Sequence, residues 1–359
     1  MRIAIDVRPL TSKLTGIGRY THNILFELLA TSPEHEWFLY ADRALTVELP
    51  DYPNVHMRVG KLKSSHMSTA FAQIFFPIWS YKDKVDIFWS PRHHLPLLLT
   101  KKITKITTIH DIVWKRYPET MTSFGRLLER FLMPISLRLS THIISVSTFT
   151  KSELIDTFNI ASNKITVTPL APTNLTENLI SELPTNLLGK KFFLFVGTLE
   201  PRKNLKNLLI SFKEFCKKND DYYLAISGKN GWGNQSIIDV VRNLDLNNKV
   251  ILLGYTKENV LHALYKNCNA LLMPSLYEGF GLPAIEALNY AKPVVATSQS
   301  AISNEISPLV INTNDESVES ILDCLYQIKN VTRQHFMRPE LPTWQESAAI
   351  TKSILFKTS

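Results

Sequence analysis

The stretch from Glu278 to Glu286 reads E-G-F-G-L-P-A-I-E, and it predicts the turn between a buried strand and a helix. It follows the apolar run 270–275, which is typical of a strand, and it opens a helical run that extends to Tyr290. Pro283 suits the first helical position, where a missing backbone N–H costs nothing. A strand, a turn and a helix in this order form the repeating unit of a parallel α/β sheet.

The same stretch has the composition of a ligand-binding turn. The residues before the helix, Phe280, Gly281 and Leu282, carry no side-chain oxygen that could cap it. The free N–H groups and the two glycines suit an anion or a sugar hydroxyl. Glu278 and Glu286 add carboxylates, which accept hydrogen bonds from the vicinal hydroxyls of a ribose or hexose. The alternative is an ordinary corner with two solvated glutamates.

Short apolar runs alternate with amphipathic runs along the chain. The predicted strands are 2–7, 37–41, 86–89, 106–110, 142–146, 165–168, 192–196, 222–227, 250–253, 270–273 and 293–297. The predicted helices are 18–30, 69–81, 124–139, 148–158, 205–217, 235–244, 260–265, 283–290 and 344–356. This order predicts an α/β protein with two doubly wound parallel sheets that face each other across a cleft.

The domain boundaries follow from a break in this pattern. Residues 171–190 contain two prolines and three asparagines and are predicted to be a linker. The first domain is then 1–170 and the second 191–330. The C-terminal segment 331–359 carries the helix 344–356, a candidate to cross back to the first domain.

Composition narrows the class of protein. The chain has 359 residues, 45% of them hydrophobic and 20% charged, which indicates a globular protein of two domains. Three scattered cysteines favour a reducing cytoplasm, and no apolar run is long enough to span a membrane. Residues 1–170 hold 21 Lys and Arg against 14 Asp and Glu, and so carry most of the net charge of +8. That half could face nucleic acid, an anionic membrane or a phosphorylated substrate.

A second motif follows the predicted strand 192–196. It runs from Gly197 and Thr198 through Arg202 and Lys203 to Asn204. A guanidinium beside an ammonium group suits a diphosphate, although a solvated basic turn would look the same. The phosphate interpretation is favoured because this turn and the 278–286 stretch follow strands of one predicted sheet.

The motifs of the first half are less specific. His110 ends a predicted strand and could bind a sugar hydroxyl or a leaving phosphate, or it could simply be held by Asp111 or the backbone. Gly16 and Gly18 lie between the first strand and a helix, as part of a dinucleotide-binding pattern.

The sequence predicts no metal and no other cofactor. No two aspartates lie two positions apart, so no Asp-x-Asp pair is present to hold a metal–diphosphate complex. His93 and His94 have no partner at metal-ligand spacing. Arg202, Lys203 and helix N-termini would then have to stabilise a leaving diphosphate.

Together these motifs resemble those of the retaining glycosyltransferases of family 4. They are Gly197-Thr-x-x-Pro-Arg-Lys-Asn, Ser275-x-x-Glu-Gly-Phe-Gly-Leu-Pro-x-x-Glu, Pro293-Val-Val-Ala, Gly16-Ile-Gly-Arg-Tyr-Thr and Thr343-Trp-Gln-x-Ser-Ala. The resemblance covers nearly the whole chain. It implies the GT-B fold, with two Rossmann-like domains around a cleft, the acceptor on the first and the nucleotide sugar on the second.

The resemblance also implies a role for each residue. Glu278 would bind hydroxyls of the donor sugar, Arg202 and Lys203 would stabilise the leaving diphosphate, and His110 would contact the transferred sugar. The nucleotide-sugar site would include Gly16, Gly18, Gly197, Thr198, Phe280, Gly281, Leu282 and Glu286, with Glu286 on the ribose. Front-side attack with retention would need no enzyme nucleophile.

The motif style is closest to bacterial mannosyltransferases of O-antigen and polysaccharide assembly. This implies GDP-mannose as the donor and a glycan or lipid-linked acceptor. A UDP-hexose donor stays open, and an epimerase or a non-catalytic sugar-binding protein are alternatives. A lipid-linked acceptor would place the basic half on the inner face of the cytoplasmic membrane, through a helix in 61–81 or 124–139, unless the apolar stripes of these helices lie in the core. No motif indicates nucleic-acid binding.

Overall fold

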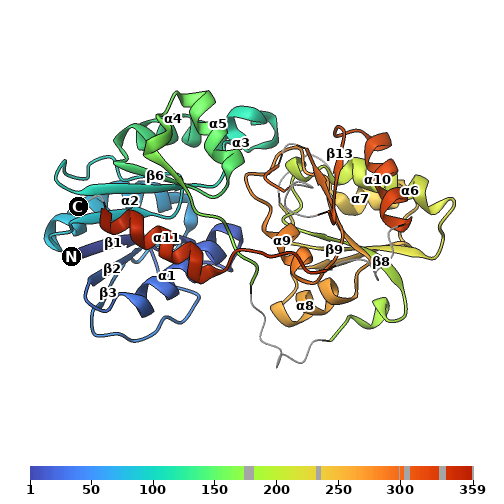
Figure 1. The fold of residues 1–359 in the computed structure, drawn as a ribbon, viewed down its shortest axis with the longest axis horizontal. Coiled ribbons are helices and arrows are strands. Elements are labelled where there is room, and N and C mark those ends of the chain that lie inside the picture. The colour runs from blue at the N-terminus through green and yellow to red at the C-terminus, as the bar shows by residue number, and fades with distance from the viewer. Residues whose placement is uncertain (174–181, 232–235, 299, 303–307, 331–336, 358–359) are drawn as a thin grey trace. The chain divides into compact units, whose positions relative to one another are not determined.

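The computed structural model describes residues 1–173, 182–231, 236–298, 300–302, 308–330 and 337–357, and the chain forms two compact units (Figure 1). Unit 1 consists of Met1–Ile112, Phe124–Leu170 and Pro342–Ser359. Unit 2 consists of Val113–Ser123 and Ala171–Leu341. The chain therefore enters unit 2 briefly at Val113–Ser123 and returns to unit 1. It then forms the rest of unit 2 from Ala171 to Leu341 and ends in unit 1.

Unit 1 is built on a parallel sheet of seven strands in the order β3-β2-β1-β4-β5-β6-β7. The strands are β1 (Arg2–Asp6), β2 (Glu36–Ala41), β3 (Val55–Val59), β4 (Ile87–Ser90), β5 (Thr104–Ile109), β6 (His142–Ser145) and β7 (Ile165–Val167). Its helices are α1 (Gly16–Thr31), α2 (Ser68–Lys82), α4 (Ser123–Leu139), α5 (Thr148–Phe158) and α11 (Trp344–Lys357). The order reverses between β1 and β4.

Helices cover both faces of this sheet. Successive side chains of a strand point to opposite faces, and Phe88 and Trp89 of β4 show where each face packs. Phe88 belongs to a core cluster with Phe76 of α2, whereas the ring of Trp89 lies 6.3 Å from that of Tyr20 in α1. The first two helices thus lie on opposite faces, as a doubly wound sheet requires.

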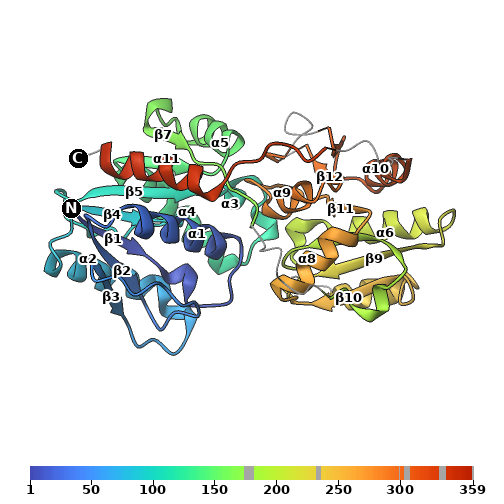
Figure 2. The same cartoon turned by 60° about the horizontal axis from the view of Figure 1, so that its bottom comes forward.

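The C-terminal helix α11 packs beside α1 in unit 1, as both ribbon views show (Figure 2). The Nζ atom of Lys352 donates to the carbonyl oxygen of Thr31 at 2.6 Å, and the hydroxyl of Ser347 donates to that of Pro169 at 2.6 Å. The last helix therefore belongs to the N-terminal core although it follows unit 2 in sequence.

Unit 2 repeats the plan with six parallel strands in the order β10-β9-β8-β11-β12-β13. The strands are β8 (Lys191–Val196), β9 (Tyr222–Ser227), β10 (Val250–Gly254), β11 (Ala270–Met273), β12 (Val294–Thr297) and β13 (Val310–Thr313). The helices are α3 (Val113–Arg116), α6 (Leu205–Cys216), α7 (Ile237–Asn243), α8 (Glu258–Asn267), α9 (Leu282–Asn289) and α10 (Val318–Asn330). Phe193 and Phe195 of β8 join α6, α7 and α10 in the main core cluster.

The excursion Val113–Ser123 is held to unit 2 by polar and aromatic contacts. The hydroxyl of Tyr117 donates to Oε1 of Glu316 at 2.8 Å, and the rings of Tyr117 and Tyr277 lie 6.1 Å apart. The sequence-based boundary at residue 170 places this segment in the first domain, and the structure differs because these contacts join it to the second.

The prediction of two doubly wound parallel sheets is confirmed. The sequence missed β3, β13 and α10. In both sheets the strand order reverses between the first and the fourth strand, β1/β4 and β8/β11. In such sheets, ligands bind outside the carboxyl ends of the strands at this switch point.

Candidate active site

The switch point of unit 2 carries a buried cluster of charges. Lys203 ends the short helix Pro201–Lys203 after β8, and Glu278 lies in the loop after β11. The Nζ atom of Lys203 donates to Oε1 of Glu278, and both residues are buried. The same Oε1 accepts from the hydroxyl of Ser275 at 2.8 Å. The ammonium group of Lys203 has three donors, so this pairing leaves capacity for a ligand.

Arg202 joins the two loops a second time. Its Nη1 atom lies 3.1 Å from Oε2 of Glu278 and donates to the carbonyl oxygen of Tyr277 at 2.8 Å. Its Nη2 atom donates to Oε1 of Glu200 at 2.8 Å. The guanidinium is thereby fixed in orientation at the sheet edge.

Glu278 is ionised despite its burial. Burial alone would raise the pKa of its carboxyl group, but the charges of Lys203 and Arg202, with hydrogen bonds from Lys203 and Ser275, lower that pKa to about 2. The structure therefore holds a carboxylate, not a carboxylic acid, beside two cations. Such a group can accept hydrogen bonds from sugar hydroxyls and cannot act as a general acid near neutral pH.

The start of α9 is an uncapped helix N-terminus. Gly281 is its N-cap, with φ at +97°, and no side chain caps the helix, as the sequence predicts. A Cβ atom at Gly281 would lie 2.8 Å from Cε of Met273. The helix begins at Leu282, so Pro283 occupies its second position rather than its first. Phe280 is partly buried directly before this turn.

Glu286 lies inside α9 and is buried. Its Oε2 atom accepts from the hydroxyl of Tyr265 in α8 at 2.7 Å, and its Oε1 accepts from Thr173 at 3.4 Å. The ring of Tyr265 stacks on that of Tyr290 at 5.9 Å. Sequence reasoning missed Tyr265, because only the fold brings α8 against α9.

The turn that contains Gly197 and Thr198 packs backbone against backbone. The amide of Gly197 donates to the carbonyl oxygen of Ser227 at 3.0 Å. A Cβ atom at Gly228 would lie only 1.7 Å from the carbonyl oxygen of Gly197. Glycine is therefore required at 228, and this contact fixes the turn that leads to Thr198 and on to Arg202.

In unit 1, His110 follows β5 and is buried. Its Nε2 atom contacts the carbonyl oxygen of Pro91 at 2.9 Å, so Nε2 must carry a proton. Its ring lies edge-on to Tyr20 at 5.0 Å. Burial, with smaller effects from His93 and Arg92, lowers the pKa of His110 to about 3, so the imidazole is neutral at pH 7. The contact with Pro91 is the backbone partner that the sequence analysis gave as one of the two interpretations of His110.

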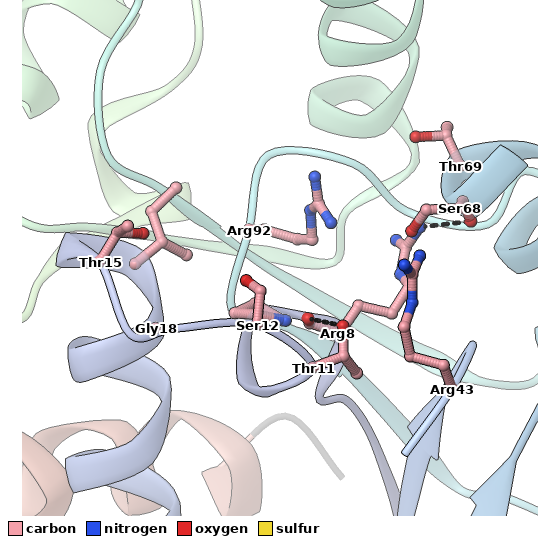
Figure 3. A pocket seen from close by; sticks show the side chains of 11 residues that line it. Arg8, Thr11, Ser12, Thr15, Gly18, Arg43, Ser68, Thr69 and Arg92 are labelled. Atoms are coloured by element: carbon pink, nitrogen blue, oxygen red, sulfur yellow. Dashed lines mark hydrogen bonds between the residues drawn. The ribbon is translucent and has the colours of Figure 1, made fainter. Parts of the chain in front are cut away.

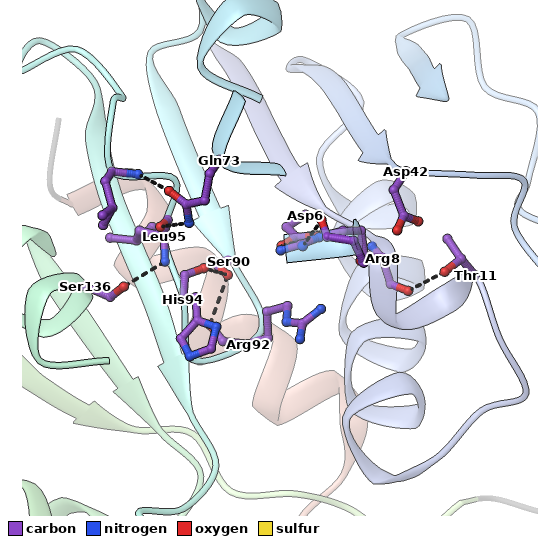
Figure 4. Close-up of polar contacts among 12 residues, drawn as sticks. Asp6, Arg8, Thr11, Asp42, Gln73, Ser90, Arg92, His94, Leu95 and Ser136 are labelled. Atoms are coloured by element: carbon purple, nitrogen blue, oxygen red, sulfur yellow. Dashed lines mark hydrogen bonds and ion pairs between the residues drawn. The ribbon is translucent and has the colours of Figure 1, made fainter. Parts of the chain in front are cut away.

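His93 and His94 acquire a partner that the sequence did not reveal. Glu129 of α4 lies 3.3 Å from Nδ1 of His93 and 3.1 Å from Nε2 of His94. Ser90 steadies this loop, donating to the carbonyl oxygen of His94 at 2.8 Å (Figure 4). The part of the chain that the structure describes contains no group of three or more His, Cys, Asp or Glu side chains that could hold a metal ion.

A polar pocket of about 330 Å³ opens beside the start of α1 (Figure 3). Its lining includes Arg8, Arg43, Arg92, Ser12, Thr15 and Thr69, together with Gly18. A Cβ atom at Gly18 would lie 3.0 Å from the carbonyl oxygen of Pro9, whereas one at Gly16 would meet no atom within 4 Å. The sequence singled out the two glycines but not the three arginines.

Comparison with known proteins decides the family. The model for Glycosyltransferase Family 4 matches residues 14–171, and that for Glycosyl transferases group 1 matches residues 182–323. The O-antigen chain mannosyltransferase RfbU of Salmonella typhimurium is 30% identical over 271 residues, which cover 70% of this chain and 71% of that protein. This chain is a family 4 glycosyltransferase. It is thus a retaining enzyme that moves a sugar from an activated donor to an acceptor.

Two further comparisons agree with this assignment. The O-antigen chain mannosyltransferase B of Escherichia coli is 29% identical over 337 residues, covering 88% of this chain and 87% of that protein. The crystal structure of WaaG, a glycosyltransferase involved in lipopolysaccharide biosynthesis, superposes with a TM-score of 0.74 over 99% of this chain and all of WaaG. At 12% identity that likeness concerns the fold alone, which is GT-B in this family 4 enzyme.

Proposed function

We propose that this family 4 enzyme transfers mannose from GDP-mannose to a glycan or lipid-linked acceptor in the assembly of a cell-surface polysaccharide. The names of two O-antigen mannosyltransferases that match most of the chain support mannose as the transferred sugar. A UDP-hexose is the second candidate donor. The observation that carries the catalytic assignment is the contact of Lys203 and Arg202 with Glu278 at the β8/β11 switch point.

The donor would bind with its diphosphate against Lys203, Arg202 and the uncapped start of α9. Lys203 keeps ammonium donors beyond the one that Glu278 takes, and the amides at Gly281 and Leu282 have no side-chain cap. Gly197 and Thr198 form the neighbouring turn. These groups would stabilise the negative charge that develops as the bond from the sugar carbon to the phosphate oxygen breaks.

The sugar and the ribose would each meet a carboxylate. Glu278 would accept from hydroxyls of the transferred hexose, and Glu286, oriented by Tyr265, from those of the ribose. His110, Gly16 and Gly18 in unit 1 would contact the transferred sugar and the diphosphate or acceptor. The acceptor hydroxyl attacks on the face that the leaving group vacates, and its proton passes to the departing phosphate oxygen.

The donor is tested by thermal unfolding of the full chain with GDP-mannose, UDP-glucose and ADP-glucose. Ligands that bind only the folded state raise its stability, so GDP-mannose should give the largest shift. The shift should vanish in Lys203→Ala and persist in Lys206→Ala, which removes an exposed lysine three residues away. A shift with UDP-glucose alone would replace GDP-mannose by the second candidate.

Metal independence is tested by donor binding and by a nucleotide-release assay of turnover. The enzyme should bind the donor and release the nucleotide equally well after treatment with EDTA. Restoration of activity by added Mg²⁺ or Mn²⁺ would contradict this part of the proposal.

We also infer that unit 1 docks on an anionic lipid surface through α4. Phe124, Leu127, Phe131 and Ile135 form an exposed apolar stripe at helical spacing, with Phe124 69% and Phe131 60% exposed. Exposed arginines at 126, 130 and 138 flank it, which matches the negative charge of such a surface. No helix among the described residues is long and apolar enough to cross a membrane.

Vesicle flotation tests the lipid surface as partner. The enzyme should float with vesicles that contain phosphatidylglycerol, and Phe131→Ser should reduce the bound fraction. Leu188→Ser, which changes an equally exposed residue of unit 2, is the matched control. Equal binding to neutral and anionic vesicles would contradict the proposal.

A further inference from the structure

The pocket at the start of α1 lies at the switch point of unit 1. Arg8 follows β1, Arg43 follows β2 and Arg92 follows β4, so all three arginines come from the carboxyl ends of adjacent strands. Figure 3 shows Arg92 on one side of the hollow, with Arg8 and Arg43 on another. This is the place where a doubly wound sheet binds ligands.

Two of the three cations are already neutralised. Arg8 donates to Asp6 through Nε at 2.8 Å and Nη2 at 2.5 Å, and Arg43 donates to Asp42 through Nη2 at 2.8 Å (Figure 4 shows the first pair). Both carboxylates are fully buried. The pairs fix the two guanidinium groups in place but leave them with no net charge.

Arg92 supplies the charge that remains. Within the residues that the structure describes, its partly buried guanidinium makes no hydrogen bond and no ion pair. Burial lowers its pKa, but an arginine stays protonated near neutral pH. Asp6, Glu129 and Asp42 act on Arg92 from a distance, but none forms an ion pair with it in the described residues. A cation that is partly withdrawn from water and not directly paired is stabilised when an anion binds.

Neutral donors complete the lining. In the described part of the chain, the hydroxyls of Ser12, Thr15 and Thr69 make no hydrogen bond. Thr15 is the N-cap of the sixteen-residue helix α1, yet its side chain does not cap the helix. The first N–H groups of α1 are therefore also without an intrahelical acceptor.

We propose that this pocket binds a phosphate group of the acceptor, such as the phosphate that joins a glycan to its lipid. The inference rests on the proposed function and names the chemistry of the acceptor. One unpaired guanidinium with three hydroxyls suits the tetrahedral oxygens of a phosphate better than a neutral sugar. The pocket volume of about 330 Å³ has room for a phosphate and an adjoining group, and the donor diphosphate is assigned to Lys203 in unit 2.

Calorimetric titration of the full chain with inorganic pyrophosphate tests the pocket. A saturating concentration of a nucleoside diphosphate is present throughout, so that the donor site is filled. It is GDP if GDP-mannose gives the largest thermal shift, and UDP if UDP-glucose does. Pyrophosphate should still bind, and Arg92→Gln should weaken that binding about tenfold or more, since it removes a charge-assisted contact. Lys102→Gln, which removes an exposed charge elsewhere in unit 1, should leave it unchanged, and Arg92→Lys should restore part of it.

The possible outcomes distinguish a site for the acceptor phosphate from a site for the donor diphosphate. If the nucleotide abolishes pyrophosphate binding, the pocket belongs to the donor site and the proposal is overturned. Equal binding in Arg92→Gln and the native enzyme overturns it as well. An enzyme that uses a UDP-hexose would still retain pyrophosphate here, so an error in the proposed donor leaves this test intact.

Discussion

The ammonium group of Lys203 donates to Oε1 of Glu278, across 75 positions of sequence. The bond joins the turn after β8 to the loop after β11, at the point where the strand order of unit 2 reverses. Ser275 and Arg202 bind the same carboxylate. The pair therefore stabilises the fold of unit 2 and also belongs to its candidate active site.

Breaking this pair should affect stability and activity together. We expect Lys203→Met to lower the free energy of unfolding by about 3 kcal/mol, because Glu278 stays buried with fewer partners. The value of kcat/KM should fall by roughly 100-fold or more, because a charge aimed at the leaving group is lost. Denaturant unfolding and steady-state kinetics measure the two effects, with Lys206→Met as the control.

A double-mutant cycle tests whether Lys203 and Glu278 act as a unit. Lys203→Met combined with Glu278→Gln should lose less stability and activity than the sum of the single changes, because each removes the same contact. Full additivity would mean that the contact contributes nothing. A folded Lys203→Met enzyme with native turnover would exclude the catalytic role.

Gly281 offers a second test, because it combines a positive φ with a close contact. Gly281→Ala places a methyl group 2.8 Å from Cε of Met273 and strains the turn that starts α9. We expect a stability loss of about 2–3 kcal/mol and a clear loss of kcat, since the helix N-terminus must shift. Thermal unfolding and initial rates measure these effects.

Gly189→Ala is the matched control. Gly189 has φ at +71° but open space around it, so the variant carries only the backbone cost of about 1 kcal/mol. Its turnover should match the native enzyme. If both variants lose activity to the same extent, a shift of the α9 N-terminus does not explain the loss of kcat in Gly281→Ala.

Tyr265 is expected to act through Glu286. Tyr265→Phe removes the hydroxyl that binds Oε2 of Glu286 but keeps the ring stacked on Tyr290. A positioning role predicts a KM for the nucleotide sugar raised several-fold, with kcat nearly unchanged, because ribose binding is remote from the reacting bond. A fall in kcat at constant KM would instead place the effect at the chemical step.

The sequence predicted most of the fold because the interior strands are continuous apolar runs. β3 was missed since its residues, Val55–Val59, mix polar and apolar side chains and lie half exposed at the sheet edge. The excursion Val113–Ser123 was placed in the wrong unit because local pattern does not show which core a short segment joins.

The candidate site was predicted by motif, and its internal contacts were not. The sequence placed Lys203 and Glu278 on one sheet edge, yet gave no sign that they bind each other. Tyr265 and Glu129 were missed because each contacts a partner distant in sequence, and Arg92 was missed because only the fold brings it into one pocket with Arg8 and Arg43. These arrangements depend on tertiary packing, and the spacing of residues along the chain does not show which distant residues pack together.

His110 makes the stability of unit 1 depend on pH. The buried imidazole is neutral, with its pKa lowered from 6.5 to about 3, while in the unfolded chain it takes up a proton below about pH 6.5. Its contribution is therefore complete above pH 6.5 and is lost as the pH falls toward 3. At pH 5 the loss should be about 2 kcal/mol.

Comparing His110→Gln with the native enzyme isolates the effect of His110 from that of His93. Burial lowers the pKa of His93, but the charge of Glu129 and its hydrogen bond raise it overall. Denaturant unfolding at pH 8 and pH 5, followed by tryptophan fluorescence, should show a smaller loss on acidification in the variant. His66→Gln, at an exposed position, should keep the native pH dependence. If His110→Gln and His66→Gln lose stability equally between pH 8 and pH 5, the buried imidazole does not control the acid response, and His110 must be exposed enough to titrate normally in the folded enzyme.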